Sequence, residues 1–354
     1  MARKFKITIT KKCPIKCDYC FVDKDNQVMD YKTAKAAIDF LLENGEKGKM
    51  ILIFLYGGEP LLYPELMKRI IKYAFSRSKE IERDIFICIG TNGMLLTKEI
   101  ITFFKKYDIG IALSLGGDKK THDKFRHYAN KKGTFDEVLL KLELLKKEMS
   151  PYRYYVAYCL HPEQVDRLYD NFVYLHSLGI RSFRIEWIYD LKRKWGKREV
   201  DIAVKNYIRI WKYVMKSIKG NEPIYLVNFM DFINSPELDE GGMHCKINTL
   251  EISPSGNISL SSFLNSSEKN VVGNVSDGLK KDLFACRATF ENIDNQICHY
   301  CKNRHIKDIS EIVENLGMIE DEFKKISERY LGQINSLGKE GDAYLANLQK
   351  YFPF

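Results

Sequence analysis

The chain has 354 residues, of which 45% are hydrophobic and 29% are charged, with a formal net charge of +9. These proportions are typical of a globular protein, and the length is sufficient for one large domain and a smaller one. No apolar run approaches the ~18–20 residues of a membrane span and no cleavable signal is present, so we expect a cytoplasmic protein without a membrane partner. The positive charge is mostly lysine spread over predicted helix faces, which indicates a solvated surface as readily as an acidic ligand, and nucleic acid is not the expected partner.

A cysteine loop follows the first predicted strand, residues 4–10. Cys13, Cys17 and Cys20 stand in a C-x3-C-x2-C spacing, so one tight loop supplies three thiolates. A cubane [4Fe–4S] cluster normally takes four cysteines, and three leave one iron open for a small molecule. The alternative is a zinc knuckle, although zinc sites usually close four ligands from paired motifs. Nine cysteines in a chain with no secretory features also favour a reducing compartment, where thiols bind metals.

Strands and helices alternate over residues 1 to about 190. Apolar segments predict strands and amphipathic segments predict helices: strands at 50–56, 84–90, 110–115, 153–160 and 182–188, and helices at 31–42, 64–77, 97–107, 135–148 and 163–178. Near-continuously apolar strands indicate a parallel sheet with helices on its outer face. Right-handed crossovers curl such a repeat into a partial barrel, with active groups at the carboxyl ends of the strands.

Those strand ends carry polar and glycine-rich segments. The second strand runs into Gly57-Gly58-Glu59-Pro60, where two glycines let the backbone approach a ligand closely. The third strand ends at Thr91-Asn92 and the fourth at Ser114, with Arg126 soon after. A Gly-Gly-Glu-Pro segment on its own is more often a simple turn, and Arg126 is equally consistent with a solvated helix residue.

Together these motifs resemble the radical S-adenosylmethionine (radical SAM) superfamily, including Tyr19 before the third cysteine. The resemblance implies a (β/α)6 partial TIM-type barrel in which Cys13, Cys17 and Cys20 bind a [4Fe–4S] cluster. It also implies that residues 57–60 hold the methionine amino group of S-adenosylmethionine, with Thr91 and Asn92 nearby. Ser114 and Arg126 become candidates for its ribose and carboxylate. The departure from the peptide-modifying branch is Gly116, where that branch usually carries Asp.

Two later strand ends hold further candidates. His161 closes the fifth strand, where relatives often have an Asn that contacts the adenosine, although a lone His there is commonly structural. Arg184 and Glu186 share one face of the sixth strand, with apolar residues on the other. They are candidates for substrate contact, and an internal ion pair is the equal alternative.

The C-terminal part resembles a Twitch/SPASM auxiliary-cluster domain. Cys245 opens it, a predicted hairpin over 248–253 and 258–262 follows, and Cys298 and Cys301 end it. These three cysteines are candidate ligands of a second, auxiliary iron–sulfur cluster. The second hairpin cysteine of that domain is replaced by Ser261. Cys286 is a candidate fourth ligand or hydrogen-atom donor, and the alternatives are a site left open to substrate and a buried structural Cys.

We therefore expect an α/β protein with four parts: a radical SAM partial barrel (1–195), a helical linker (196–240), a small β-hairpin/helix auxiliary-cluster domain (241–308) and a helical tail (309–354). The expected activity is a 5′-deoxyadenosyl radical that modifies a peptide or protein side chain by crosslinking, oxidation or epimerisation. The resemblance also implies reduced flavodoxin or ferredoxin as electron donor. The alternatives are a Twitch-type dehydrogenase or cyclase for a small metabolite, and a binding protein with a structural metal.

Overall fold

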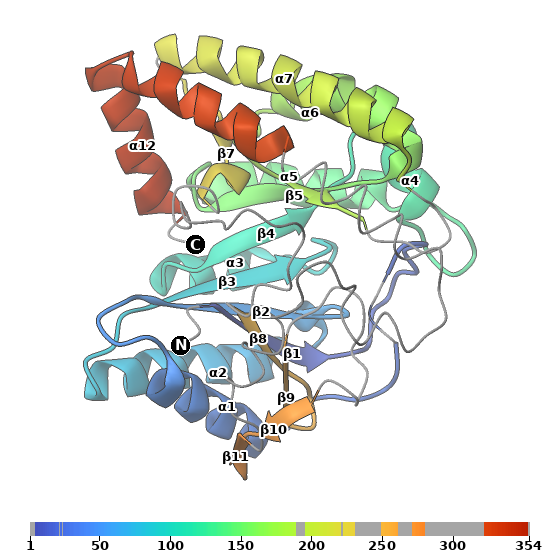
Figure 1. The fold of residues 1–354 in the computed structure, drawn as a ribbon. Coiled ribbons are helices and arrows are strands. Elements are labelled where there is room, and N and C mark those ends of the chain that lie inside the picture. The colour runs from blue at the N-terminus through green and yellow to red at the C-terminus, as the bar shows by residue number, and fades with distance from the viewer. Residues whose placement is uncertain are drawn as a thin grey trace. The chain divides into compact units, whose positions relative to one another are not determined.

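The computed structural model describes residues 4–20, 22, 24–188, 195–220, 222–230, 249–260, 271–279 and 322–352. The chain divides into two compact units, and Figure 1 labels most of their helices and strands. The first unit comprises residues 1–114, 123–154 and 245–292, and the second comprises residues 115–122, 155–244 and 293–354. Helix α4 (Lys119–Phe125) has residues in both.

Parallel strands form the centre of the first unit. Each pairs with the next in chain order: β1 (Lys4–Thr10), β2 (Ile51–Gly57), β3 (Ile85–Thr91) and β4 (Gly110–Ser114). Most residues of β2 and β3 are buried, as expected for strands covered on both faces. Because the strands are parallel, their carboxyl ends lie along one edge of the sheet.

Helices fill the connections after these strands: α1 (Tyr31–Asn44), α2 (Pro64–Glu80), α3 (Lys98–Lys106) and α5 (Phe135–Glu148). Helix α1 begins where the carboxylate of Asp30 accepts a hydrogen bond from the N–H of Thr33 at 2.7 Å, which caps the helix. Helices α1 and α2 lie side by side in Figure 1, and the Tyr73 hydroxyl donates to Asp39 across them at 2.8 Å.

A hairpin from late in the chain extends the same sheet. Strand β8 (Thr249–Ile252) pairs in parallel with β1 and antiparallel with β9 (Asn257–Leu260), and β10 (Val271–Asn274) and β11 (Gly278–Leu279) continue the sheet. Gly256 in the turn has φ +80°, a conformation that favours glycine. The predicted hairpin is confirmed. Its pairing with β1 was not predicted.

The second unit has its own parallel strands, β5 (Tyr154–Leu160), β6 (Ser182–Trp187) and β7 (Tyr225–Leu226). Helices α6 (Leu168–Ser177) and α7 (Lys197–Lys219) run beside each other (Figure 1). The described C-terminal residues, 322–352, include α12 (Lys339–Tyr351) and pack aromatic rings onto this unit. Tyr344 stacks on Tyr225 with ring centroids 5.0 Å apart, so this part of the tail contributes to the core.

The helix predicted over 163–178 is two elements. A 3-10 helix, η2 (Pro162–Arg167), precedes α6. Asn206 on α7 donates its side-chain amide to the carbonyl of Val165 at 2.7 Å, and Gln164 donates to the carbonyl of Thr121 at 3.1 Å. These buried side-chain bonds hold the tighter turn, which periodicity alone could not show. Among the described residues, no helix has both the length and the apolar character needed to cross a membrane.

Candidate functional site

The cysteine loop leaves the carboxyl end of β1 and returns to it. The N–H of Met29 donates to the carbonyl of Ile9 at 2.8 Å, and Thr10 and Val28 form an antiparallel bridge, which closes the base of the loop. All three thiols of the loop are free and partly exposed, and the N–H of Cys20 donates to the carbonyl of Cys17 at 3.2 Å. A single closed loop therefore carries the three thiols that the sequence placed together.

The Gly57–Pro60 segment packs its backbone directly against this loop. The N–H of Gly58 donates to the carbonyl of Thr10 and the N–H of Glu59 donates to the carbonyl of Lys12, each at 2.8 Å. A Cβ on Gly58 would lie 2.1 Å from the Lys12 oxygen, and Gly57 also has φ +139°. The glycines are needed here because the two backbones touch. An amino group donates its hydrogens, so an amino group bound by this segment would contact its carbonyl oxygens.

Glu59 connects the ends of β2 and β3. Its carboxylate is fully buried and accepts hydrogen bonds from the Thr91 hydroxyl (2.8 Å), the N–H of Asn92 (2.8 Å) and the N–H of Leu61 (3.0 Å). Burial raises the pKa of Glu59, while the bonds from Asn92 and Thr91 act in the opposite direction. The side chain of Asn92 places its Nδ2 3.9 Å from Sγ of Cys13. Glu59 therefore fixes the groups that lie beside the first cysteine.

The other side of the cysteine loop is held by the segment after α4. The N–H of Lys16 donates to the carbonyl of His127 at 2.7 Å, and the N–H of Asp18 donates to the carbonyl of Phe125 at 3.0 Å. The side chains of Asp18 and His127 also meet at 3.0 Å. Sequence reasoning missed Asp18 and His127, because only the folded loop brings residues 109 positions apart together.

Arg126 is buried in this segment, with 8% of its surface exposed. Its Nη1 donates to the hydroxyl of Tyr19 at 2.8 Å, and the Tyr19 ring packs against Phe125 with centroids 6.2 Å apart. Arg126 lies just past the end of α4, so the alternative of a solvated helix residue is wrong. A buried guanidinium beside the cysteine loop is suited to holding a carboxylate.

An opening of about 510 Å³ lies beside Cys13, lined also by Lys12, Pro14, Lys24 and Leu62. Burial raises the pKa of the Cys13 thiol, against the opposing effects of the Ile15 backbone and the Lys24 ammonium. Burial likewise raises the pKa of Cys20. Thiols of this kind lose their protons on binding a metal, so metal loading releases protons here.

The remaining described candidates lie at strand ends. Ser114 ends β4 in the first unit and is partly exposed. In the second unit His161 is fully buried, and its Nδ1 accepts a hydrogen bond from the N–H of Glu163, which caps η2. Arg184 and Glu186 form an ion pair, with Nε and Oε1 2.6 Å apart. The alternative of an internal ion pair is confirmed, and substrate contact by either residue stays a prediction.

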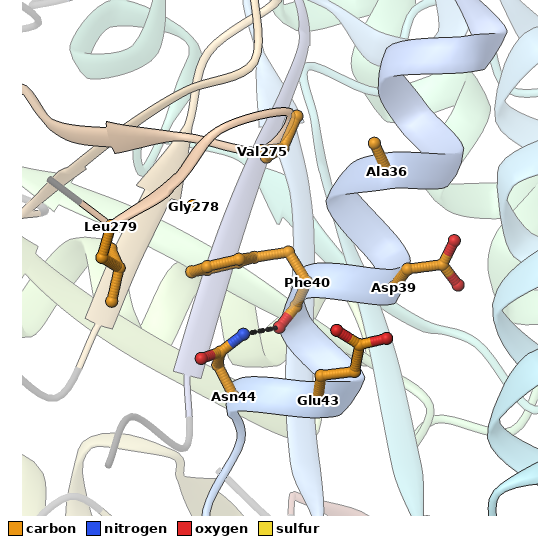
Figure 2. Close-up of a pocket in the computed structure, with 8 residues that line it drawn as sticks. All are labelled: Ala36, Asp39, Phe40, Glu43, Asn44, Val275, Gly278 and Leu279. Atoms are coloured by element: carbon orange, nitrogen blue, oxygen red, sulfur yellow. Dashed lines mark hydrogen bonds between the residues drawn. The ribbon is translucent and has the colours of Figure 1, made fainter.

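Four candidate cysteines lie outside the described residues: Cys245, Cys286, Cys298 and Cys301. The structure therefore does not test the auxiliary cluster, and the predicted limits of its domain stay a prediction. A second opening, of about 410 Å³, lies between α1 and β10–β11 and contains none of the candidates (Figure 2). Phe40 points toward Leu279 there, with Asp39 and Glu43 to one side.

The cysteine loop carries ligands of the kind that an iron–sulfur cluster takes. Within the described ranges, no group of three or more His, Cys, Asp or Glu side chains is placed to hold one metal ion. A cubane binds its thiolates at different irons, so its ligands need not converge on one point. The three loop cysteines form no disulfide, and their thiols are soft ligands of the kind that iron–sulfur clusters prefer. The residues present therefore fit the cluster.

This chain is similar in sequence to several known proteins and similar in fold to a solved structure. An uncharacterised protein of Methanocaldococcus jannaschii is 28% identical over 223 residues, 63% of this chain and 73% of that one. A cysteine-type anaerobic sulfatase-maturating enzyme of Clostridium novyi is 27% identical over 146 residues, so the match spans only 38% of that enzyme and 38% of this chain. The solved structure of native anSMEcpe with bound AdoMet has a TM-score of 0.73 at 17% identity and covers 94% of this chain and 98% of that one.

The structural likeness confirms the partial TIM-type barrel. Residues 7–172 match the family described as the Radical SAM superfamily, a range that contains the cysteine loop, the Gly57–Pro60 segment and Arg126. Proteins of this family bind a [4Fe–4S] cluster and S-adenosylmethionine. Residues 7–172 of this chain are therefore a radical SAM domain.

Proposed function

We propose that this enzyme modifies a side chain of a peptide or protein by hydrogen abstraction, with Cys13, Cys17 and Cys20 holding its [4Fe–4S] cluster. When bound, the cluster and S-adenosylmethionine supply a 5′-deoxyadenosyl radical that abstracts hydrogen from an unactivated C–H bond. The observation that carries the proposal is the cysteine loop clamped between the Gly57–Pro60 backbone and residues 125–127. This clamp orients the three thiols before any ligand arrives.

The surrounding residues have separate roles in this proposal. Acceptor groups of Gly57–Pro60 bind the methionine amino group, and the buried Arg126 binds its carboxylate. Glu59 and Thr91 are positioning residues, because their side chains bond to each other and to the backbone rather than to the opening. Ser114 and His161 stay candidates for the ribose and adenine.

A peptide or protein substrate is supported by the similarity to the sulfatase-maturating enzyme of Clostridium novyi, which acts on another protein. We also propose a one-electron donor, reduced flavodoxin or ferredoxin, because the radical is produced by reduction. It also includes a cytoplasmic location, where the loop thiols stay reduced.

The test is anaerobic reconstitution with iron and sulfide, followed by addition of dithionite and S-adenosylmethionine. The wild-type protein should produce 5′-deoxyadenosine, and Cys17→Ala should not. Cys88→Ala is the matched control, because Cys88 is buried within β3 and is not part of the loop. Full 5′-deoxyadenosine production by Cys17→Ala would contradict the proposal that the loop cysteines hold the cluster.

The substrate class is tested separately by deuterium transfer. Candidate peptides with deuterated side chains should pass deuterium into 5′-deoxyadenosine when they are substrates, because the radical removes the hydrogen atom itself. Transfer from a small metabolite and from no peptide would instead support the dehydrogenase or cyclase.

The auxiliary cluster is tested by iron content. Two cubane clusters correspond to about eight irons per chain and one to about four. Changing both Cys298 and Cys301 to Ala should lower the count from about eight to about four. Changing Cys286→Ala then separates its alternatives: loss of the second cluster identifies a ligand, and a surviving cluster with arrested turnover identifies a hydrogen-atom donor.

A further inference from the structure

The side chain of Lys24 is bonded to the middle of the cysteine loop. Its Nζ donates to the backbone carbonyl of Ile15 at 2.6 Å, as a charge-assisted hydrogen bond. Ile15 is buried and stands between Cys13 and Cys17, whereas Lys24 follows the third cysteine and is partly exposed. This bond therefore ties the outgoing part of the loop back to the segment that joins its first two cysteines.

Ile15 also connects Lys24 with the thiol of Cys13. The backbone N–H of Ile15 bonds to the Cys13 sulfur while its carbonyl accepts from Lys24, so one residue lies between the ammonium and the thiol. Lys24 and Cys13 line the same opening of about 510 Å³. Burial raises the pKa of the Cys13 and Cys20 thiols, and the charge of Lys24 acts in the opposite direction on each. The positive charge therefore acts on two of the three loop cysteines.

The described carboxylates of the loop are bonded to other groups. Asp25, next to Lys24 in the chain, accepts from the Lys11 ammonium at 3.1 Å and from a backbone N–H. Asp18 accepts from groups of the segment after α4. Asp23 lies outside the described residues. Within the described part of the loop, then, the ammonium of Lys24 bonds to a carbonyl and pairs with neither carboxylate.

Two further carboxylates lie at the borders of the loop. Asp30 caps α1 by accepting from the N–H of Thr33. Glu59 is fully buried, and its charge acts on Cys13 in the sense opposite to that of Lys24. Lys24 is therefore the positive counterpart of Glu59 at the first cysteine.

Resting on the proposed function, we propose that Lys24 is a positioning residue that holds the cysteine loop closed and favours the one-electron-reduced state of its cluster. Taking up one electron from a reductant, which is itself oxidised, adds one negative charge to a cluster held by three thiolates. A fixed positive charge beside Cys13 stabilises the more negative state and so raises the reduction potential. Because partly buried charges are screened less than exposed ones, the effect should persist at ordinary salt concentrations.

The experiment measures the reduction potential of the reconstituted full-length protein. Titration with dithionite, followed by electron paramagnetic resonance, gives the potential of the loop cluster, whose signal is the one that Cys17→Ala lacks. Lys24→Met should shift the reduction equilibrium about tenfold toward the oxidised cluster, which corresponds to about 59 mV for one electron. Lys24→Arg keeps the charge and a donor for the Ile15 carbonyl, so it should keep the wild-type potential.

The matched control is Lys147→Met, which removes one lysine charge from an exposed position in the last turn of α5. Its potential should equal that of the wild type. If Lys24→Met retains too little iron for the titration, Lys24→Gln takes its place, because glutamine keeps a polar donor without the charge.

The proposal is wrong if the potential of Lys24→Met is unchanged, if Lys24→Arg shows an equal fall, or if Lys147→Met does. A rise of about tenfold in the Kd for S-adenosylmethionine, with the potential unchanged, would make Lys24 a ligand-binding residue of the opening instead. Failure of the proposed function is distinguishable, because the wild-type protein would then show no signal that Cys17→Ala loses.

Discussion

The carboxylate of Glu59, after β2, accepts a hydrogen bond from the backbone N–H of Asn92, after β3, at 2.8 Å. The same carboxylate accepts from Thr91 and from Leu61, so one buried side chain fixes two neighbouring strand ends. The N–H of Glu59 also donates to the cysteine loop. Glu59 therefore links the loop, the end of β2 and the end of β3.

Replacing Glu59 by Gln should destabilise the protein. The amide keeps one acceptor oxygen and points N–H groups at donors, which leaves buried groups unsatisfied at a cost of about 2 kcal/mol. Thermal unfolding of the metal-free protein measures the effect. Glu65→Gln, on an exposed side chain of α2, is the control and should change stability by less than about 0.5 kcal/mol. Equal effects of the two changes would contradict the role given to Glu59.

Gly58→Ala should lower the rate of S-adenosylmethionine cleavage about 100-fold, because its methyl group would displace the backbone at Lys12 and with it the cysteine loop. Gly116→Ala is the control. A Cβ there would lie no closer than 3.7 Å to any heavy atom, at Cα of His122, so the rate should be kept. Production of 5′-deoxyadenosine under dithionite compares them, and an active Gly58→Ala variant would show that the close backbone approach is dispensable.

Arg126→Gln should raise the Kd for S-adenosylmethionine about tenfold, the loss expected for a charge-assisted bond worth about 1.4 kcal/mol. Tyr19→Phe should have a smaller effect, and the double variant should lose less than the sum, because Tyr19 acts by orienting Arg126. Equilibrium binding to the reconstituted protein measures the cycle.

Arg69 and Tyr31 provide a control pair for this cycle. The Arg69 guanidinium lies 3.7 Å from the centroid of the Tyr31 ring on the helical side of the first unit, and Arg69 is exposed. Changes in that pair should leave the Kd unaltered. If the effects of the Tyr19 and Arg126 changes on the Kd simply add, the two residues are not coupled.

Because of Asp118, the free energy of unfolding should depend on pH in the acid range. Burial would raise its pKa, but hydrogen bonds from Thr121 and the charge of Arg167 outweigh it, so the folded pKa lies below the ordinary 3.8. The carboxylate therefore stabilises the fold above that value, and the contribution is lost as the pH falls through the lowered pKa. Asp118→Asn should cost less than about 1 kcal/mol at pH 7, and the difference from wild type should shrink below about pH 4.

Unfolding by urea between pH 3 and pH 7 checks this. Asp170→Asn, on the exposed face of α6, is the control for exchanging a carboxylate for an amide and should change the free energy of unfolding at pH 7 by less than about 0.5 kcal/mol. A constant difference for Asp118→Asn would show that its charge is not what stabilises α4.

Local patterns in the sequence were sufficient for much of the fold. The strands of residues 4–187 and most of the helices were predicted to within a few positions, because apolar periodicity and caps such as Asp30 act over short distances. Helix α4 and the 3-10 helix η2 were not predicted. The meeting of the cysteine loop, Gly57–Pro60 and Thr91 at one edge also followed from parallel strands. What could not be predicted were contacts that need the folded loops, such as Asp18 with His127, and the burial of Arg126.

The pairing of β8 with β1 has a consequence for how the chain folds. Thr8 and Glu251, bonded at 3.1 Å, are 243 positions apart. One edge of β1 therefore stays without its neighbour until most of the chain has left the ribosome, and an unpaired apolar edge is a site for wrong association. Because such distant contacts slow folding, completion of the sheet beside the cysteine loop should be a late event in biosynthesis.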